Sequence, residues 1–452
     1  MRLAWFTPLS TRLSGVAAHS APILDALARD SDLDVDVYVD DGDPALLAPR
    51  RGHGMTVRAA HDFVWRNSLR RYDLTVYQLA NAGSHAYLWG YVVRYPGLAV
   101  LHDTVLHHAR LHHARNRYGA ASRRPGEYRA ELRYDRPELH DGVGGIAGLR
   151  VPHLLAQWPL LRPILETARC TAVHDPDAAD DLRRRYPGCR VDVLRFGVAR
   201  SDPEPQPTNP DPVVFAAVAH STCVGGVENL LRALGRVRRE RPATLRILGA
   251  VENAAGVMAR AFAAGLDAEA VILPERGPAG DGPDSASLRG CDICVALQER
   301  PGEVTDSWLR CLAAGRPTIV SARARLVDVP LLDPRSWRNL HGGPEEGVAV
   351  GVDPRHEDET LWLAMRRLAV DGNLRQALGR RALSWWKARS GRQAEMVDDY
   401  RRLLHELVRE RPAPAAGLPA HFRADGMELA RGIGEDCGLA GDLFGLTPAG
   451  RS

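Results

Sequence analysis

Lysine is almost absent from this chain of 452 residues, because Lys387 is the single lysine and arginine carries nearly all the positive charge. A phosphate-binding loop of the GxxxxGK[ST] kind is therefore excluded, since it requires a lysine. The formal net charge of +3 is close to neutral for this length. Because no compact basic block with interleaved aromatic residues occurs either, the sequence argues against a nucleic-acid partner.

A dinucleotide-binding glycine fingerprint is also missing. The first predicted strand, Leu3–Phe6, is followed by residues 7–15, which contain no GxGxxG pattern, so a standard nicotinamide-dependent dehydrogenase is not expected. The seven cysteines show no paired metal-ligand spacing. Cys291 and Cys294 form a lone CxxC, and Cys294 lies in an apolar run, which favours a buried structural thiol.

Long hydrophobic segments and a signal-peptide layout are not found. The apolar run Leu154–Leu165 is interrupted by Pro159 and Pro163 and is too short to cross a bilayer. This run could touch a lipid-linked substrate, but a buried helix is the favoured interpretation. With an odd number of scattered cysteines, these features predict a cytoplasmic protein in a reducing compartment.

Alternating strand and helix patterns fill most of the chain and predict an α/β fold with parallel sheets covered on both faces. The length favours two domains. Before residue 200, the predicted strands are Leu3–Phe6, Val35–Val39, Leu74–Leu79, Leu98–Leu101, Thr171–His174 and Val191–Leu194. After residue 212, they are Val213–Val218, Thr244–Leu248, Ala270–Leu273, Ile293–Leu297 and Thr318–Val320.

The proline-rich segment 201–212 is the clearest linker and separates a domain at 1–200 from a domain at 213–390. A charged amphipathic helix is expected at 391–410, and the Ala/Gly/Pro-rich tail 411–452 is expected to be poorly ordered. Two such domains should face each other across a central cleft, with ligands beyond the carboxyl ends of the strands.

The segment Pro301–Pro317 reads as a loop, a helix that begins near Thr305, Asp306 and Ser307, and a stop at Gly315. Free N–H groups at a helix start can bind an anion, although an ordinary capped helix fits the pattern equally well.

Histidines are concentrated between residues 102 and 113. His102 directly follows the strand Leu98–Leu101, the position favoured for functional residues in parallel sheets. Asp103 could orient His102 or cap the next helix. His108 and His112 are four residues apart, a metal-compatible spacing, but a third ligand is lacking and no metal site is predicted.

Several segments, taken in order, resemble one family. They are residues 6–8, 14–17, 77–81, 85, 95–97, 101–103, 106–108, 172–174, 184–188, 196–198, 291–297 and 302–321. Together they resemble the bacterial retaining glycosyltransferases of family 4 and span roughly residues 1–400. The family has the GT-B fold of two Rossmann-like domains, the first binding the acceptor and the second a nucleotide-diphosphate sugar. The resemblance thus implies a retaining, metal-independent transferase with no cofactor besides this donor.

The resemblance also implies roles for particular residues. Catalysis would use His102 and Asp103, and the acceptor side would include Gln78, Asn81 and His85. Gly15 would let the first loop approach the donor diphosphate. The donor side would also include Glu303, Thr305, Asp306 and Ser307. Arg195 and Arg310 are added as donor-side candidates from their positions in this sequence and not from the resemblance.

Two departures weaken the donor assignment. Arg310 stands where the family usually has a second glutamate, and arginine cannot accept a hydrogen bond from a ribose hydroxyl. Residues 221–227 carry no charge where the family has a basic pair. Arg195 could replace that pair or be a surface arginine. A pseudo-enzyme or partner subunit is therefore the alternative, and a sugar-nucleotide epimerase is less favoured.

The acceptor cannot be identified from the sequence. A glycan, a lipid-linked molecule, a small molecule and a protein all stay open, as do peripheral membrane contact and the oligomeric state.

Overall fold

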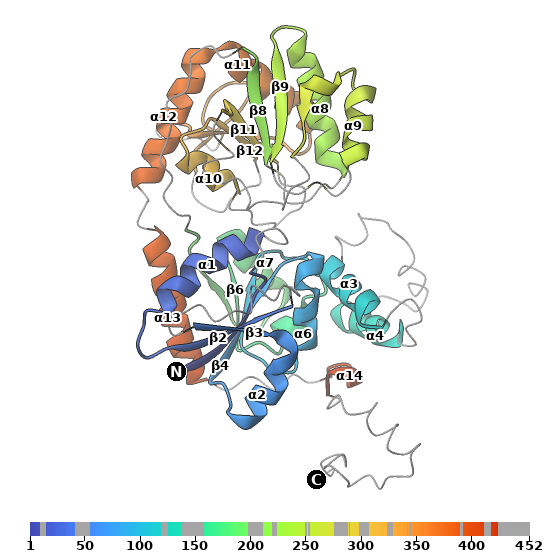
Figure 1. The fold of residues 1–452 in the computed structure, drawn as a ribbon, viewed down its shortest axis with the longest axis vertical. Coiled ribbons are helices and arrows are strands. Elements are labelled where there is room, and N and C mark those ends of the chain that lie inside the picture. The colour runs from blue at the N-terminus through green and yellow to red at the C-terminus, as the bar shows by residue number, and fades with distance from the viewer. Residues whose placement is uncertain are drawn as a thin grey trace.

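Two parallel sheets, each with seven strands, form the centre of the protein, and helices cover both (Figure 1). The structure is a computed structural model. It describes residues 1–9, 15–40, 55–118, 125–137, 158–197, 211–218, 224–248, 251, 254–274, 288, 290–297, 307–322, 329–340, 342, 346–388, 392–410 and 417–423. The predicted α/β architecture of two Rossmann-like domains is confirmed.

The first sheet has the strand order β3-β2-β1-β4-β5-β6-β7. Because the order reverses direction between β1 and β4, the carboxyl ends of these strands form a topological switch point, where ligands bind in open α/β sheets. Its strands are β1 (Arg2–Phe6), β2 (Asp34–Val39), β3 (Met55–Ala59), β4 (Leu74–Leu79), β5 (Leu98–Leu101), β6 (Cys170–Val173) and β7 (Val191–Val193).

The second sheet repeats this plan with the order β10-β9-β8-β11-β12-β14-β13, and its switch point lies between β8 and β11. Three of its central strands, β11, β12 and β14, are buried at every residue, as expected for a parallel sheet covered on both faces. The strands are β8 (Val213–Val218), β9 (Ala243–Leu248), β10 (Val271–Ile272), β11 (Ile293–Ala296), β12 (Thr318–Ser321), β13 (Leu331–Leu332) and β14 (Ala349–Val352).

Helices follow the strands in both halves. The first half includes α1 (Gly15–Leu27), η1 (Ala60–Asp62), α2 (Phe63–Leu69), η2 (Gly83–Gly90), α3 (His107–Tyr118), α4 (Pro125–Asp135), α6 (Arg162–Leu165) and α7 (Pro176–Arg185). The second half includes α8 (Val224–Arg238), α9 (Ala254–Ala263), η4 (Ala268–Ala270), α10 (Ser307–Ala313), α11 (Glu357–Val370) and α12 (Gly372–Ala388).

Helix α10 is the helix predicted from the segment 301–317. Trp308, Leu309 and Leu312 recur at helical spacing and are buried in the core of the second domain. The helix ends at Ala313, and Gly315 just beyond it has a φ of 65°, in the left-handed region that glycine adopts without strain. A Cβ at Gly379 would lie 2.5 Å from the Gly315 carbonyl oxygen, so a glycine on α12 permits close packing at this helix end.

The C-terminal helix α13 (Arg392–Val408) follows the second domain in sequence but packs against the first (Figure 1). Tyr400 lies against Trp5 with ring centroids 5.5 Å apart, and Leu403 and Leu404 are buried in the same cluster. Arg401 on this helix also pairs with Asp30 at 2.7 Å. The chain therefore crosses twice between its two halves.

Part of the segment predicted to be a poorly ordered tail is a docked element. The short helix α14 (Ala420–Arg423) buries Phe422 in the core of the first domain. The His421 ring lies 2.7 Å from Glu131, a fully buried carboxylate that also pairs with Arg110. Leu418 packs against the same core, and the composition of the tail concealed these apolar contacts. Residues 411–416 and 424–452 lie outside the described residues.

The apolar run 154–165 is described from residue 158, and this part is buried, as the sequence predicted. Leu160, Leu161 and Ile164 are fully buried in the first domain. Asp135 supports the backbone here, because its carboxylate accepts hydrogen bonds from the N–H groups of Leu160 and Leu161. The linker at 201–212 is described only from residue 211.

Candidate functional site

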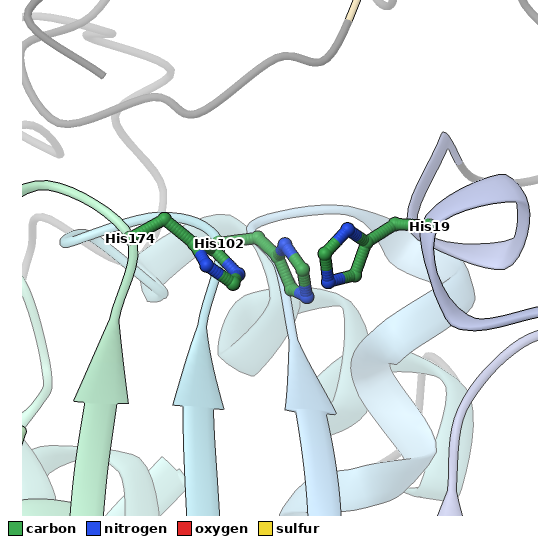
Figure 2. Close-up of side chains that lie close together, drawn as sticks. All are labelled: His19, His102 and His174. Atoms are coloured by element: carbon green, nitrogen blue, oxygen red, sulfur yellow. The ribbon is translucent and has the colours of Figure 1, made fainter. Parts of the chain in front are cut away.

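Three histidines meet near the carboxyl ends of the strands of the first sheet. His102 directly follows β5, His174 directly follows β6, and His19 lies on α1. Parallel strands present their carboxyl ends at one edge, so β5 and β6 place His102 and His174 side by side, and α1 brings His19 against them (Figure 2). All three side chains are buried, with residue exposures of 2–4%.

His102 is oriented by a chain of buried polar groups. Its Nε2 lies 2.7 Å from Gln78 Oε1, and the Gln78 amide nitrogen donates to the Tyr400 hydroxyl at 3.3 Å. Because Tyr400 lies on α13, the C-terminal helix helps to fix a ring at the edge of the first sheet. Gln78, predicted on the acceptor side, is fully buried and acts here on His102.

Burial lowers the pKa of two of these imidazoles, His102 and His174. The pKa of His102 is held well below its usual range by burial first, and then by the neighbouring His19 and His174. Burial likewise lowers the pKa of His174 to about 4, although its Nδ1–H donates to the Leu194 carbonyl oxygen at 3.0 Å. A neutral imidazole can offer one N–H donor and one lone pair.

Asp103 and Asn81 connect two loops beneath this site. The Asp103 carboxylate accepts a hydrogen bond from the Asn81 backbone N–H at 2.6 Å. The Asn81 side-chain oxygen accepts from the N–H groups of His108 and Ala109, at 2.8 and 3.2 Å, and so caps the start of α3. The cap of α3 is therefore supplied by Asn81. The Asp103 carboxylate instead joins its own loop to the loop that contains Asn81.

His85, the third predicted acceptor-side residue, is buried at 2% exposure. Its Nδ1 lies 2.9 Å from the Gln78 carbonyl oxygen, and burial lowers its pKa to about 4. Asn81 is half-buried, whereas Gln78 and His85 are buried.

The predicted donor residues are only partly described. Gly15 is the first residue of α1, and Ser307 is the first residue of α10. Arg310 lies one turn further along α10 and is half-buried. Glu303, Thr305 and Asp306 lie outside the described residues, so their predicted role stays a prediction.

Arg195 forms a bidentate ion pair with Asp399 on α13. Its Nε and Nη2 lie 2.7 and 2.8 Å from the two carboxylate oxygens, and its Nη1 lies 2.9 Å from Glu395. The hydrogen bonds to Asp399 raise the Arg195 pKa further above its already high value. All three guanidinium nitrogens therefore bond to carboxylates of α13. This favours a structural role for Arg195 over the predicted role, in which it would replace the basic pair missing from the donor domain.

Comparison with known proteins rests on structure alone, because the sequence matches no described family profile and no curated protein. The structure of WaaG, a glycosyltransferase involved in lipopolysaccharide biosynthesis, matches with a TM-score of 0.55 at 13% identity, covering 88% of this chain and 99% of WaaG. Anabaena HepE in complex with UDP and glucose matches with a TM-score of 0.56 at 13% identity, covering 90% and 100%. A glycosyltransferase from Rickettsia africae matches at 0.53 and 10% identity, covering 91% and 99%.

The chain has the GT-B fold. Both sheets take part in this similarity, because about nine-tenths of the chain is covered in each comparison. In this GT-B chain, no helix within the described ranges is long and apolar enough to cross a membrane.

Sequence reasoning found only one member of the histidine group in this GT-B protein. His102 was predicted because it follows a clear apolar strand. His174 lies in a segment that resembles the family, but the resemblance gives it no role, and no sequence pattern marks His19. The usable signal is that His174 is the last residue of the predicted strand Thr171–His174, because neighbouring parallel strands bring the residues at their carboxyl ends together.

Proposed function

We propose that this protein is a glycosyltransferase that moves a sugar from a nucleotide-diphosphate donor to an acceptor with retention of configuration. The GT-B fold over nine-tenths of the chain is the observation that carries the proposal. One structural neighbour, Anabaena HepE, was solved with UDP-glucose, with a TM-score of 0.55 at 12% identity. This neighbour supports a nucleotide-sugar as the donor class.

In the proposed reaction, the bond between sugar C1 and the diphosphate oxygen breaks while C1 bonds to the acceptor hydroxyl oxygen. The hydroxyl proton passes to the departing diphosphate. The sugar carries oxocarbenium-like positive charge in the transition state. A neutral His102, oriented by Gln78, can hydrogen-bond to the sugar without adding an unfavourable positive charge. We further propose that no Mg²⁺ or Mn²⁺ on the diphosphate is needed.

A nucleotide-binding screen tests this proposal. Thermal unfolding with UDP, GDP, TDP and ADP should show a raised midpoint for at least one, since a ligand bound only by the folded state stabilises it by about 2.7 kcal/mol at 100 times its Kd. Isothermal titration should give the same nucleotide. Folded protein that binds none of the four contradicts the proposal.

Arg310 offers a sharper version of this test. The variant Arg310→Glu restores the residue type that the resemblance predicts there, a carboxylate able to accept bonds from ribose hydroxyls. We expect it to bind the preferred nucleotide more tightly than wild type. Arg239→Glu, with the same charge change at the exposed end of α8, is the matched control and should leave the affinity unchanged.

The second candidate is a catalytically impaired GT-B protein that serves as a partner subunit. The engagement of Arg195 with Asp399 and Glu395 favours it, because this arginine was the suggested replacement for the missing basic pair. Sugar release or transfer from a nucleotide-sugar by purified protein would exclude this candidate. An epimerase, which we favour less, would convert the nucleotide-sugar with no acceptor present.

A further inference from the structure

His19, His102 and His174 form a nearly equilateral triangle of rings. The ring centroids are 5.0 Å apart for His19 and His102, 5.0 Å for His19 and His174, and 5.1 Å for His102 and His174. One ring nitrogen of each residue lies within 4.8 Å of those of the other two. The three rings come from different elements and converge on one point above the strand ends (Figure 2).

These separations match the requirements of a metal ion. A tetrahedral Zn²⁺ with Zn–N distances of about 2.0–2.1 Å places the centroids of three imidazole ligands about 5 Å apart. The ligand nitrogens themselves would lie about 3.3 Å apart, so rotation of the rings about their side-chain bonds would bring them onto the ion. The backbone positions therefore need little change.

Hydrogen bonds outside the triangle already orient two of the rings. His174 donates its Nδ1–H to the Leu194 carbonyl oxygen at 3.0 Å, and His102 has Nε2 at 2.7 Å from Gln78 Oε1. Metal-binding histidines usually donate their second N–H to an oxygen in this way, which fixes the tautomer and leaves the other nitrogen for the metal. Nε2 of His174 is buried and has no hydrogen-bond partner among the described residues.

The surroundings suit the same role. The Phe196 ring stacks on His19 with centroids 4.8 Å apart and meets His174 edge-on at 5.0 Å. An apolar wall of this kind restricts solvent access and strengthens metal–ligand interactions.

Aromatic packing alone is the simpler explanation of the triangle. Edge-to-face contacts between rings prefer similar centroid separations. Packing does not explain why a buried nitrogen of His174 faces no donor, because buried polar atoms in folded proteins are normally hydrogen-bonded. A metal ion explains the spacing, the outer hydrogen bonds and the open nitrogen together.

We infer that His19, His102 and His174 bind one divalent transition-metal ion of the Zn²⁺ or Co²⁺ class, with a fourth position open to water or a bound anion. Imidazole donors suit zinc, copper, iron and nickel, whereas Mg²⁺ and Mn²⁺ prefer oxygen ligands. The inference uses only the first domain, and its test does not need the transfer reaction. With Nε2 of His102 on Gln78, the metal ion would take Nδ1, the nitrogen left for the sugar contact proposed above. It also leaves untouched the proposal that the diphosphate needs no Mg²⁺.

Cobalt titration of the full, untagged chain tests this inference. After treatment with a chelator, the protein should take up one equivalent of Co²⁺ with the intense visible absorption of a tetrahedral ion, and Zn²⁺ should displace it. Zn²⁺ should also raise the thermal unfolding midpoint, because a metal bound only by the folded state stabilises it.

Substitutions then locate the ion. His19→Gln and His174→Gln should each lose the absorption, and the metal-induced rise in midpoint should disappear. The double variant His108→Gln/His112→Gln is the matched control, since it removes a second histidine pair, with ring centroids 6.5 Å apart on α3, and should bind like wild type.

Three outcomes would overturn the inference. The first is folded, chelator-treated wild type that takes up no Co²⁺, and the second is undiminished binding by either His19→Gln or His174→Gln. The third is loss of binding in the α3 control, which would move the ion to that helix. Near-ultraviolet circular dichroism in the presence of chelator shows whether each variant is folded. If a variant does not fold, the Co²⁺ stoichiometry of the wild-type protein alone tests the inference.

Discussion

Three buried histidines of the first domain, His85, His107 and His174, share one arrangement that keeps them neutral. Burial lowers the pKa of His85, His107 and His174 to about 4. The Nδ1 atom of each lies 2.9–3.0 Å from a backbone carbonyl oxygen, so each ring donates one N–H to the main chain. Protonation of any of them would place an additional charge in the protein interior, which is costly. The folded state therefore resists proton uptake at these rings.

This arrangement predicts a loss of stability in mild acid, tested most simply at His107. Its ring faces the Tyr128 hydroxyl from α4 and Trp158, with His108 and Arg110 nearby on α3. Between about pH 6.5 and 4, unfolded His107 binds a proton and the folded ring does not. The contribution of neutral His107 to the free energy of unfolding is therefore complete above pH 6.5. Below pH 6.5 the free energy of unfolding falls by up to about 1.4 kcal/mol per pH unit, and by roughly 3 kcal/mol in all.

Urea unfolding of wild type and His107→Gln at pH 7, 6 and 5 measures this effect. The free energy of unfolding of the variant should decline less steeply with falling pH than that of wild type. The difference should correspond to the uptake of about one proton, because glutamine does not titrate. Identical slopes for the two proteins would contradict the prediction. His61→Gln, the same substitution at an exposed histidine, is the control.

The histidine site shows what a sequence can and cannot reveal at this scale. His102 was predictable because a short apolar strand ends directly before it. Gln78 was expected on the acceptor side, yet it is buried behind His102, since its place in β4 turns the amide inward. His19 could not be found by pattern, because its position depends on how α1 packs against β5 and β6.

Among the secondary-structure elements, the strands with long apolar runs were predicted within a residue or two, but β3, β13 and β14 were not. Strand β3 (Met55–Ala59) is an edge strand that buries only alternate residues, and β13 has only two residues. Strand β14 contains Gly351, which lowers its strand propensity but leaves room for Leu331 from β13. These strands form because a neighbouring strand is already in place.

The ion pair between Arg195 and α13 yields a prediction at this scale. Burial would raise the pKa of the Asp399 carboxyl, but the bonds from Arg195 outweigh that effect and hold it below its usual range. Asp399 is therefore stabilising above about pH 4, and this contribution is lost as the pH falls through its lowered pKa. Because the Arg195 side chain is half exposed, solvent screening limits the coupling to about 1 kcal/mol.

A double-mutant cycle with Arg195→Met and Asp399→Asn measures this coupling at pH 7. We expect the two losses of unfolding free energy to be less than additive by about 1 kcal/mol, since either change breaks the same contact. The pair Arg232 and Asp358, which links α8 to α11 between two half-exposed side chains at 3.2 Å, is the comparison and should couple more weakly. Full additivity at Arg195 and Asp399 would show that the pair does not hold α13.

For the whole molecule, α13 makes the two domains interdependent. It continues from the second domain, yet it completes a core of the first and, through Tyr400 and Gln78, reaches the histidine site. The sequence predicted this helix and both sheets, but not which domain the helix covers. Amphipathic periodicity shows that one face of a helix is buried, but it does not show which domain covers that face.

A truncation experiment tests the importance of this crossing. Five apolar residues of α13 are fully buried against β1 and α1, namely Met396, Tyr400, Leu403, Leu404 and Leu407. At roughly 2 kcal/mol for each, their burial contributes about 10 kcal/mol, which is comparable to the whole stability of a domain. A chain that ends at residue 390 should therefore lose the first domain to proteolysis and keep the second, whereas a chain that ends at residue 410 should keep both.

A synthetic peptide of residues 392–410 should restore protection of the shorter chain. Equal urea midpoints for the two chains would mean that the first sheet is stable without α13, and that Gln78 and His102 are held from their own domain alone.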